Sequence, residues 1–82
     1  MQDFIRQIEE AHSITVSFSK DRKELIILHG KIMEVNAEND VIYIDMDSAE
    51  ITINKDWGII ADGEGFVFSC DDGLNMYVDI LD

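Results

Sequence analysis

Four acidic residues near the middle of the chain form the densest group of side chains that could bind a metal ion. Asp45, Asp47 and Glu50 fall within the segment DMDSAE, and Asp40 precedes them. Carboxylate oxygens are the ligands that Ca²⁺ prefers. The segment lacks the D-x-[DN]-x-[DN]-G loop that arranges such oxygens around one ion. We therefore predict that these acids are dispersed over a surface and that the chain holds no metal.

Softer metal ligands and a thiol are also present, but their spacing is unfavourable. His12, His29 and Cys70 stand far apart, without a C-x-x-C or H-x-x-x-H spacing that would bring two ligands together. Cys70 is followed by Asp71, and a neighbouring carboxylate raises the pKa of a thiol and lowers its reactivity. These residues predict neither a metal centre nor a catalytic thiolate.

The sequence shows no other catalytic arrangement. No serine stands in a G-x-S-x-G elbow. The glycines of DGEG, residues 62–65, are accompanied by acids, which would repel a phosphate. A pair of catalytic carboxylates needs a cleft, and an 82-residue chain has little room for one. We predict a non-enzymatic protein without a cofactor.

Hydrophobic spacing divides the chain into one short helix and a series of strands. Over residues 3–11 the apolar side chains recur at helical intervals, at Phe4, Ile5, Ile8 and Ala11. From Ser13 onward apolar and polar residues alternate, as they do in half-buried strands. Strands are predicted over 13–19, 25–36, 41–47, 50–54, 57–61, 65–70 and 74–80, with turn-forming residues between them.

Gly30 interrupts the longest predicted strand, and a glycine at such a position typically marks a bulge or bend. The sequence contains no proline and no linker rich in Gly or Ser. Residues 1–82 are therefore predicted to form a single domain, with the helix over 3–11 and antiparallel strands over 13–81. The fold class is α+β, mainly β: a short N-terminal helix followed by a strongly bent antiparallel sheet or a small barrel.

Charge is distributed unevenly along the chain. The sequence carries 18 acids against 6 bases, a formal net charge of −12, yet residues 1–31 hold as many bases as acids. Lys55 is the only base after residue 31. This second part would repel nucleic acids and anionic membranes, so we expect direct binding to neither. Turn preferences explain some of the acids, Asp62 and Asp72 among them, but not the scarcity of lysine.

The acidic part of the chain is predicted to bind a basic partner protein. Asp45 and Asp47 would share one face of a strand, about 6.8 Å apart, like phosphates two steps apart along a nucleic-acid strand. Trp57, Tyr43 and Tyr77 are candidate aromatic anchors, although a lone Trp in a small barrel is more often part of the core. The predicted partner-binding residues are all acidic: Asp40, Asp45, Asp47, Glu50, Asp56, Asp62, Glu64, Asp71, Asp72 and Asp79.

The order of these elements resembles that of a known group of small barrels. A helix followed by TVSFSKDRKELIILHGKIMEVNAENDVIYID and then ITINKDWGII is similar to Sm-like and SH3-like barrels, and among them to the YolD-like bacterial and phage proteins. The similarity covers roughly residues 3–61 and depends on Gly30, Ile32 and the spacing of turns. It implies a small Sm/SH3-like barrel that acts in a DNA-damage or phage context. Residues 62–82 and the acid excess depart from it.

Two functions from different classes fit these observations. The first is a non-enzymatic acidic inhibitor or regulator that occupies the basic nucleic-acid-binding surface of a partner protein. Such a nucleic-acid mimic would be similar, in size and charge alone, to small phage-encoded inhibitors such as the uracil-DNA glycosylase inhibitor and several anti-CRISPR proteins. The alternative is an Sm-like accessory or homo-oligomerising module whose strand edges pair with a neighbour and whose charge confers solubility. With one cysteine, no long apolar stretch and no visible secretion signal, a cytoplasmic location is expected.

Overall fold

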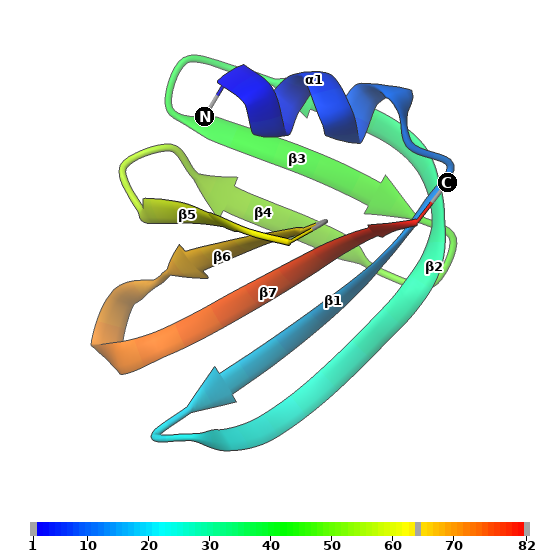
Figure 1. Cartoon of the computed structure of the whole chain (residues 1–82). Helices are drawn as coiled ribbons and strands as arrows, with labels where there is room; N and C mark the ends of the chain where they lie inside the picture. Colours follow the sequence, from blue (N-terminus) through cyan, green and yellow to red (C-terminus); the bar gives the residue numbers. More distant parts are fainter. Residues whose placement is uncertain (1, 64, 82) are drawn as a thin grey trace.

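The protein consists of one N-terminal helix and a series of closely spaced strands (Figure 1). The computed structural model describes residues 2–63 and 65–81. The elements are α1 (Gln2–Glu10), β1 (Ser13–Lys20), β2 (Lys23–Ala37), β3 (Val41–Met46), β4 (Glu50–Asn54), β5 (Gly58–Asp62), β6 (Gly65–Ser69), the 3₁₀ turn η1 (Asp71–Gly73) and β7 (Leu74–Leu81). The α-helix and the strands follow in the number and order predicted from the hydrophobic spacing, and η1 lies where a turn was predicted.

The strands form one antiparallel sheet in the order β4-β3-β2-β1-β7-β6-β5. The long strand β2 serves both parts of this sheet, because residues 23–31 pair with β1 and residues 32–37 pair with β3. The sheet curls so that its two parts face each other, and α1 lies across the space between them (Figure 1). Within residues 2–63 and 65–81, the end strands β4 and β5 do not pair. The bent-sheet form of the predicted fold class is therefore confirmed, without closure into a barrel.

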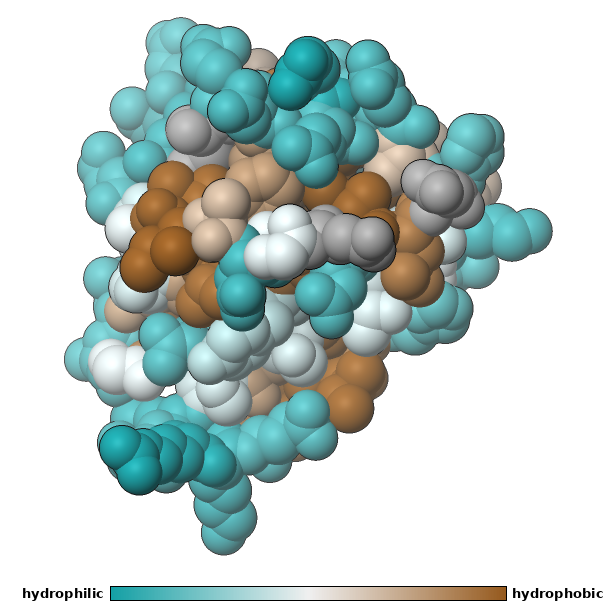
Figure 2. Space-filling view, in the orientation of Figure 1, coloured by the Kyte–Doolittle hydropathy of each residue, from teal (hydrophilic) through white to brown (hydrophobic). Residues whose placement is uncertain are grey.

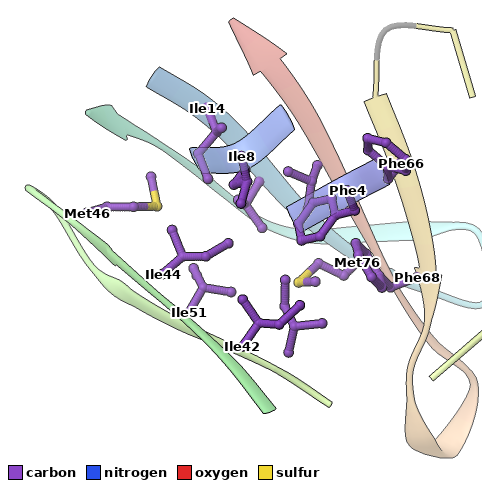
Figure 3. Packing of buried hydrophobic residues seen from close by; sticks show 13 residues of the cluster. Phe4, Ile8, Ile14, Ile42, Ile44, Met46, Ile51, Phe66, Phe68 and Met76 are labelled. Carbon is purple, nitrogen blue, oxygen red and sulfur yellow. The ribbon is translucent and has the colours of Figure 1, made fainter. Parts of the chain in front are cut away.

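The hydrophobic core lies between the two parts of the sheet and beneath α1 (Figure 3). Phe4 and Ile8, on one face of the helix, are fully buried, as their spacing predicts. The ring of Phe4 meets Phe66 and Phe68 of β6 edge to face, with centroids 5.1 Å and 4.9 Å away. Each such pair contributes about 0.5–1.5 kcal/mol beyond the burial of its area. These contacts fix α1, near the N-terminus, to β6, which lies much later in the sequence.

Alternation within the strands also agrees with the sequence prediction. Every second residue of β3 and β4 is buried, and the buried residues are Ile42, Ile44, Met46, Ile51 and Ile53.

The boundaries of several elements differ slightly from the predicted ones. The helix is shifted to Gln2–Glu10, and β2 starts at Lys23 because a loop of only two residues, Asp21 and Arg22, joins it to β1. The strand β3 ends at Met46, so Asp47 lies outside it.

Of the two features predicted for Gly30, a bulge or a bend, the bulge is absent, whereas β2 does curve where it changes its partner strand (Figure 1). Gly30 keeps its register opposite Ile14 of β1, and the irregular positions of β2 are Leu25 and Met33. Gly30 is nevertheless the last residue but one before β2 changes its partner strand, and it is buried. The absence of a side chain there serves a close contact with the β3–β4 turn.

Candidate functional site

Three carboxylates form a row across the outer face of β2, β3 and β4. Asp45 of β3 is paired in register with Glu34 of β2 on one side and with Glu50 of β4 on the other. Asp45 lies between the buried Ile44 and Met46, so its side chain faces away from the core. All three carboxylates are exposed, and strand spacing brings them within roughly 10 Å. We call Glu34, Asp45 and Glu50 the acid row.

No basic side chain neutralises the acid row in the described part of the chain. The only ion pair found there joins Arg6 to Asp3 in α1, with a separation of 3.6 Å. Lys55, the only base after residue 31, donates from its Nζ to the carbonyl oxygen of Glu38 instead. Like charges directly opposite each other destabilise a sheet. The acid row therefore lowers the stability of the fold, which makes it a candidate for a functional surface.

Two contact-forming side chains lie beside the acid row. Tyr43 occupies the next outward position of β3, where it is half-buried between Asn36 and Thr52 on the neighbouring strands. Met33, the bulged residue next to Glu34, is 65% exposed. Tyr and Met are enriched in protein interfaces, because they provide large contact areas. The role of Tyr43 as an aromatic anchor stays a prediction.

The other two aromatic candidates lie elsewhere. Trp57 is half-buried in the β4–β5 turn and packs against the core, the more frequent fate of a lone Trp in a small domain. Its Nε1 is buried and makes no hydrogen bond. Tyr77 lies on the outer face of β7, between Val67 of β6 and Ser17 of β1, at 36% exposure. Neither ring is adjacent to the acid row in the strand order.

Asp47 does not share a strand face with Asp45, contrary to the sequence prediction. It lies in the turn after β3, where its Oδ1 accepts a hydrogen bond from the backbone N–H of Lys31 at 3.0 Å. Its own N–H donates to the Lys31 carbonyl oxygen, also at 3.0 Å. Asp47 thus anchors the β3–β4 turn to β2. The residue that accompanies Asp45 on the sheet face is Glu34.

Three further predicted residues lie in turns or at the end of a strand. Asp40 belongs to the β2–β3 turn, where its carbonyl oxygen accepts from the N–H of Lys55 at 2.9 Å. Asp56 lies in the β4–β5 turn, and its N–H donates to Asn54 Oδ1 at 2.9 Å. Asp62 ends β5. All three carboxylates are exposed, and local turn chemistry accounts for acidic residues at such positions.

The remaining predicted residues lie far from the acid row in the strand order. Asp71 and Asp72 form η1, and Asp72 has a φ of 61°, a left-handed conformation that Asp tolerates better than most residues. Asp79 is exposed on β7, opposite Thr15 and Gly65. Glu64 lies outside the described residues. The described acids therefore form one organised row and several separate positions in turns and strands, rather than a single cluster.

Glu34 was missed by the sequence prediction. The predicted turn at residues 36–40 is centred on residue 38, which would bring residue 34 opposite residue 42, whereas the observed hairpin pairs Ala37 with Ile42 and so brings Glu34 opposite Asp45. The prediction considered spacing within one strand and not pairing between strands. Cross-strand neighbours are the closer ones, because adjacent strands are about 4.8 Å apart whereas i and i+2 are about 6.8 Å apart.

No set of three or more His, Cys, Asp or Glu side chains in the described ranges is arranged to hold a metal ion. His29 Nδ1 is 2.8 Å from Thr15 Oγ1 on the paired strand, so this histidine makes a cross-strand contact. Cys70 is half-buried, and burial together with the charge of Asp71 raises the pKa of its thiol. The protonated thiol is therefore favoured, as the sequence predicted from the neighbouring acid.

Searches of protein-family models, curated proteins and solved structures gave no match to this chain. The resemblance to YolD-like and Sm-like barrels accordingly stays a prediction. In the described ranges, no helix combines the length and the apolar composition needed to cross a bilayer.

Proposed function

We propose that this chain is a non-enzymatic binding protein that places its acidic outer surface on the basic, nucleic-acid-binding surface of a partner protein and excludes DNA or RNA from it. The acid row is the observation that carries the proposal. Glu34, Asp45 and Glu50 are held in register by backbone pairing, so the backbone positions of the three acids are fixed before a partner arrives. Only the side-chain rotamers of the row then have to be ordered upon binding.

Charge and shape both favour such a partner. The net charge of −12 attracts a basic protein over a distance and speeds association at low salt. The row is on the outer face of a curled sheet, a form that suits insertion into a groove (Figure 1). Tyr43 and Met33 beside the row supply the apolar contacts that would determine how long the complex lasts.

A displacement assay tests this proposal. The protein would be used as bait at low salt in a bacterial lysate, the source that the YolD-like resemblance implies, and captured proteins would be loaded with a labelled oligonucleotide. The wild-type chain should release the oligonucleotide, with an effect that weakens steeply as salt rises. The triple variant Glu34→Gln, Asp45→Asn, Glu50→Gln should lose at least about tenfold in potency.

A second triple variant controls for net charge. Glu9→Gln, Glu10→Gln and Glu24→Gln remove three charges from exposed positions outside the acid row and outside the predicted partner-binding residues, so this variant should retain the potency of the wild type. Equal potency of both triple variants would show that net charge alone, and not the row, causes the displacement. Captured partners that keep their oligonucleotide in the presence of the wild type would contradict the proposal outright.

A further inference from the structure

The first half of β2 has one free edge. Its residues from Lys23 to Lys31 pair with β1, whereas pairing with β3 begins only at Ile32. In the described part of the chain no other strand lies against the second edge of this half. The β1–β2 hairpin also extends away from α1 beyond the rest of the sheet (Figure 1). The edge therefore lies along a projecting arm.

Hydrogen bonds near the bend show which backbone groups this edge presents. The carbonyl oxygen of His29 accepts from Ser48 Oγ at 3.2 Å, and Lys31 exchanges bonds with Asp47, so both residues turn their backbone groups toward the β3 side. Backbone direction alternates along a strand. Ile27 therefore also turns its N–H and carbonyl oxygen to the free edge, where no strand receives them.

The side chains along the free edge are apolar and exposed. Leu25, Ile26 and Ile27 are 57%, 50% and 55% exposed, although they are successive residues of a strand and so point to both faces. In Figure 2, brown side chains lie along β2 at the lower right, and the hairpin tip at the lower left is hydrophilic. A long apolar strand with an open edge is a site for pairing with another strand.

Both ends of this edge carry charges of both signs. The hairpin tip holds Asp21 and Glu24 beside Arg22 and Lys23, and the other end holds Lys31 and the Asp47 carboxylate, which lies beside Gly30. In an antiparallel pair of two identical edges, Arg22 and Lys23 of each copy meet Asp47 of the other copy, and Asp21 meets Lys31. An isologous interface requires this self-complementarity. The other two open edges lack it, because β4 begins with Glu50 and β5 ends with Asp62 and neither strand contains a base.

We propose that two copies of this chain pair antiparallel along the free edge of β2, which extends the sheet across a two-fold axis near Ile26. Ile27 of each copy then forms backbone hydrogen bonds with the edge of the other copy, and the exposed apolar side chains of the two arms cover each other. Arg22 and Lys23 of one copy lie beside Asp47 of the second copy. This inference does not depend on the proposed binding of a basic partner.

The salt dependence of this dimer has a definite sign. Each copy carries a net charge of −12, so the two bodies repel each other over a distance, and salt screens that repulsion. The apolar contacts and backbone bonds of the interface are little affected by salt. The dimer should therefore tighten as salt rises, opposite to the binding of a basic partner through the acid row.

Sedimentation equilibrium of the purified full chain over a wide concentration range tests the proposal. The wild type should approach twice the monomer mass, more readily at high salt. Ile26→Lys places two ammonium groups opposite each other at the axis and should raise the dissociation constant at least about tenfold. Leu25→Lys, at the exposed bulge, should also raise the dissociation constant of the dimer. A weaker dimer in both variants would exclude a folding defect of Ile26→Lys as the cause.

Ile60→Lys is the matched control, since Ile60 is also an exposed isoleucine, at 65% against 50% for Ile26, and lies on the edge strand β5. It should leave the dimer intact. A wild type that stays monomeric at every concentration and salt level would overturn the proposal. A dimer weakened by Ile60→Lys but not by Ile26→Lys would overturn it as well, because the pairing edge would then be β5.

Discussion

The carboxylate of Asp47 fills the space that a side chain at Gly30 would occupy. A Cβ built at Gly30 collides with Asp47 Oδ1 and lies 2.8 Å from Ser48 Oγ. The same carboxylate accepts a hydrogen bond from the N–H of Lys31, and the Ser48 hydroxyl donates one to the carbonyl oxygen of His29. The β3–β4 turn is thus bonded to β2 on both sides of the glycine. Gly30 permits a close approach of two elements rather than a bulge.

Replacing Gly30 should therefore destabilise the protein. Gly30→Ala displaces the Asp47 carboxylate and the Ser48 hydroxyl from their hydrogen bonds to β2, which should lower the free energy of unfolding by about 1–3 kcal/mol, and Gly30→Val should cost more. Urea unfolding followed by fluorescence measures this change. Gly58→Ala is the control, because a Cβ at Gly58 meets only Ser69 Cβ at 3.7 Å, an ordinary contact. Equal losses for Gly30→Ala and Gly58→Ala would refute the close-approach explanation.

The two-residue loop between β1 and β2 should be improved by a glycine. Asp21 and Arg22 have φ angles of 53° and 66°, the left-handed conformation that a side chain disfavours. Tight hairpin turns of this kind prefer glycine at the second position. Arg22→Gly should raise the free energy of unfolding by about 0.5–1 kcal/mol, the relief of strain being larger than the added flexibility of the unfolded chain.

Thermal unfolding measures the effect of Arg22→Gly, and Arg22→Ala separates backbone strain from charge. Both variants lose the guanidinium, but Arg22→Ala keeps a Cβ in the left-handed conformation. If Arg22→Ala stabilised the protein as much as Arg22→Gly, the effect would arise from the removed charge and not from the backbone.

Local features of the chain were predictable to the extent that they depend on one element at a time. Alternation located β3 and β4 and their buried residues, because burying one face of a strand imposes a period of two. The structural role of Asp47 was not predictable in this way, since it depends on the contact between the β3–β4 turn and Lys31. Glu34 and the free edge of β2 were missed because both depend on how β2 is divided between its two partners, β1 over residues 23–31 and β3 over residues 32–37.

Cys70 should react slowly with alkylating reagents at neutral pH. Burial, with a further contribution from the charge of Asp71, raises the pKa of its thiol, so less of the reactive thiolate is present. The rate at which iodoacetamide alkylates Cys70 should increase only at a higher pH than the rate for a free cysteine peptide. Unfolding the protein in urea should make the two pH dependences the same. The folded state also binds the thiol proton more tightly, so stability from this source is present at neutral pH and declines as pH rises through the raised pKa.

Asp71→Asn distinguishes the two causes of this shift. Burial is the larger cause, so the variant should recover only a small part of the reactivity of the free peptide. Full recovery would mean that the Asp71 carboxylate, and not burial of the thiol, sets the pKa.

Neutralising the centre of the acid row should stabilise the fold. Asp45 faces Glu34 and Glu50, and each like-charge pair directly across a sheet costs on the order of 0.2–1 kcal/mol. Asp45→Asn relieves both pairs while it keeps the size and shape of the side chain. Its free energy of unfolding should therefore exceed that of the wild type at low salt, and the difference should shrink as salt screens the wild-type row.

Asp79→Asn is the matched control for this comparison. Asp79 is also an exposed aspartate within a strand, but its cross-strand neighbours are Thr15 and Gly65, which carry no charge. Its replacement removes one negative charge from the chain without relieving a direct pair, so it should stabilise the fold less than Asp45→Asn does. Equal gains would assign the effect to the net charge of −12. A larger gain for Asp45→Asn, together with weaker displacement of nucleic acid from a partner, would show that the row is kept for binding at the expense of stability.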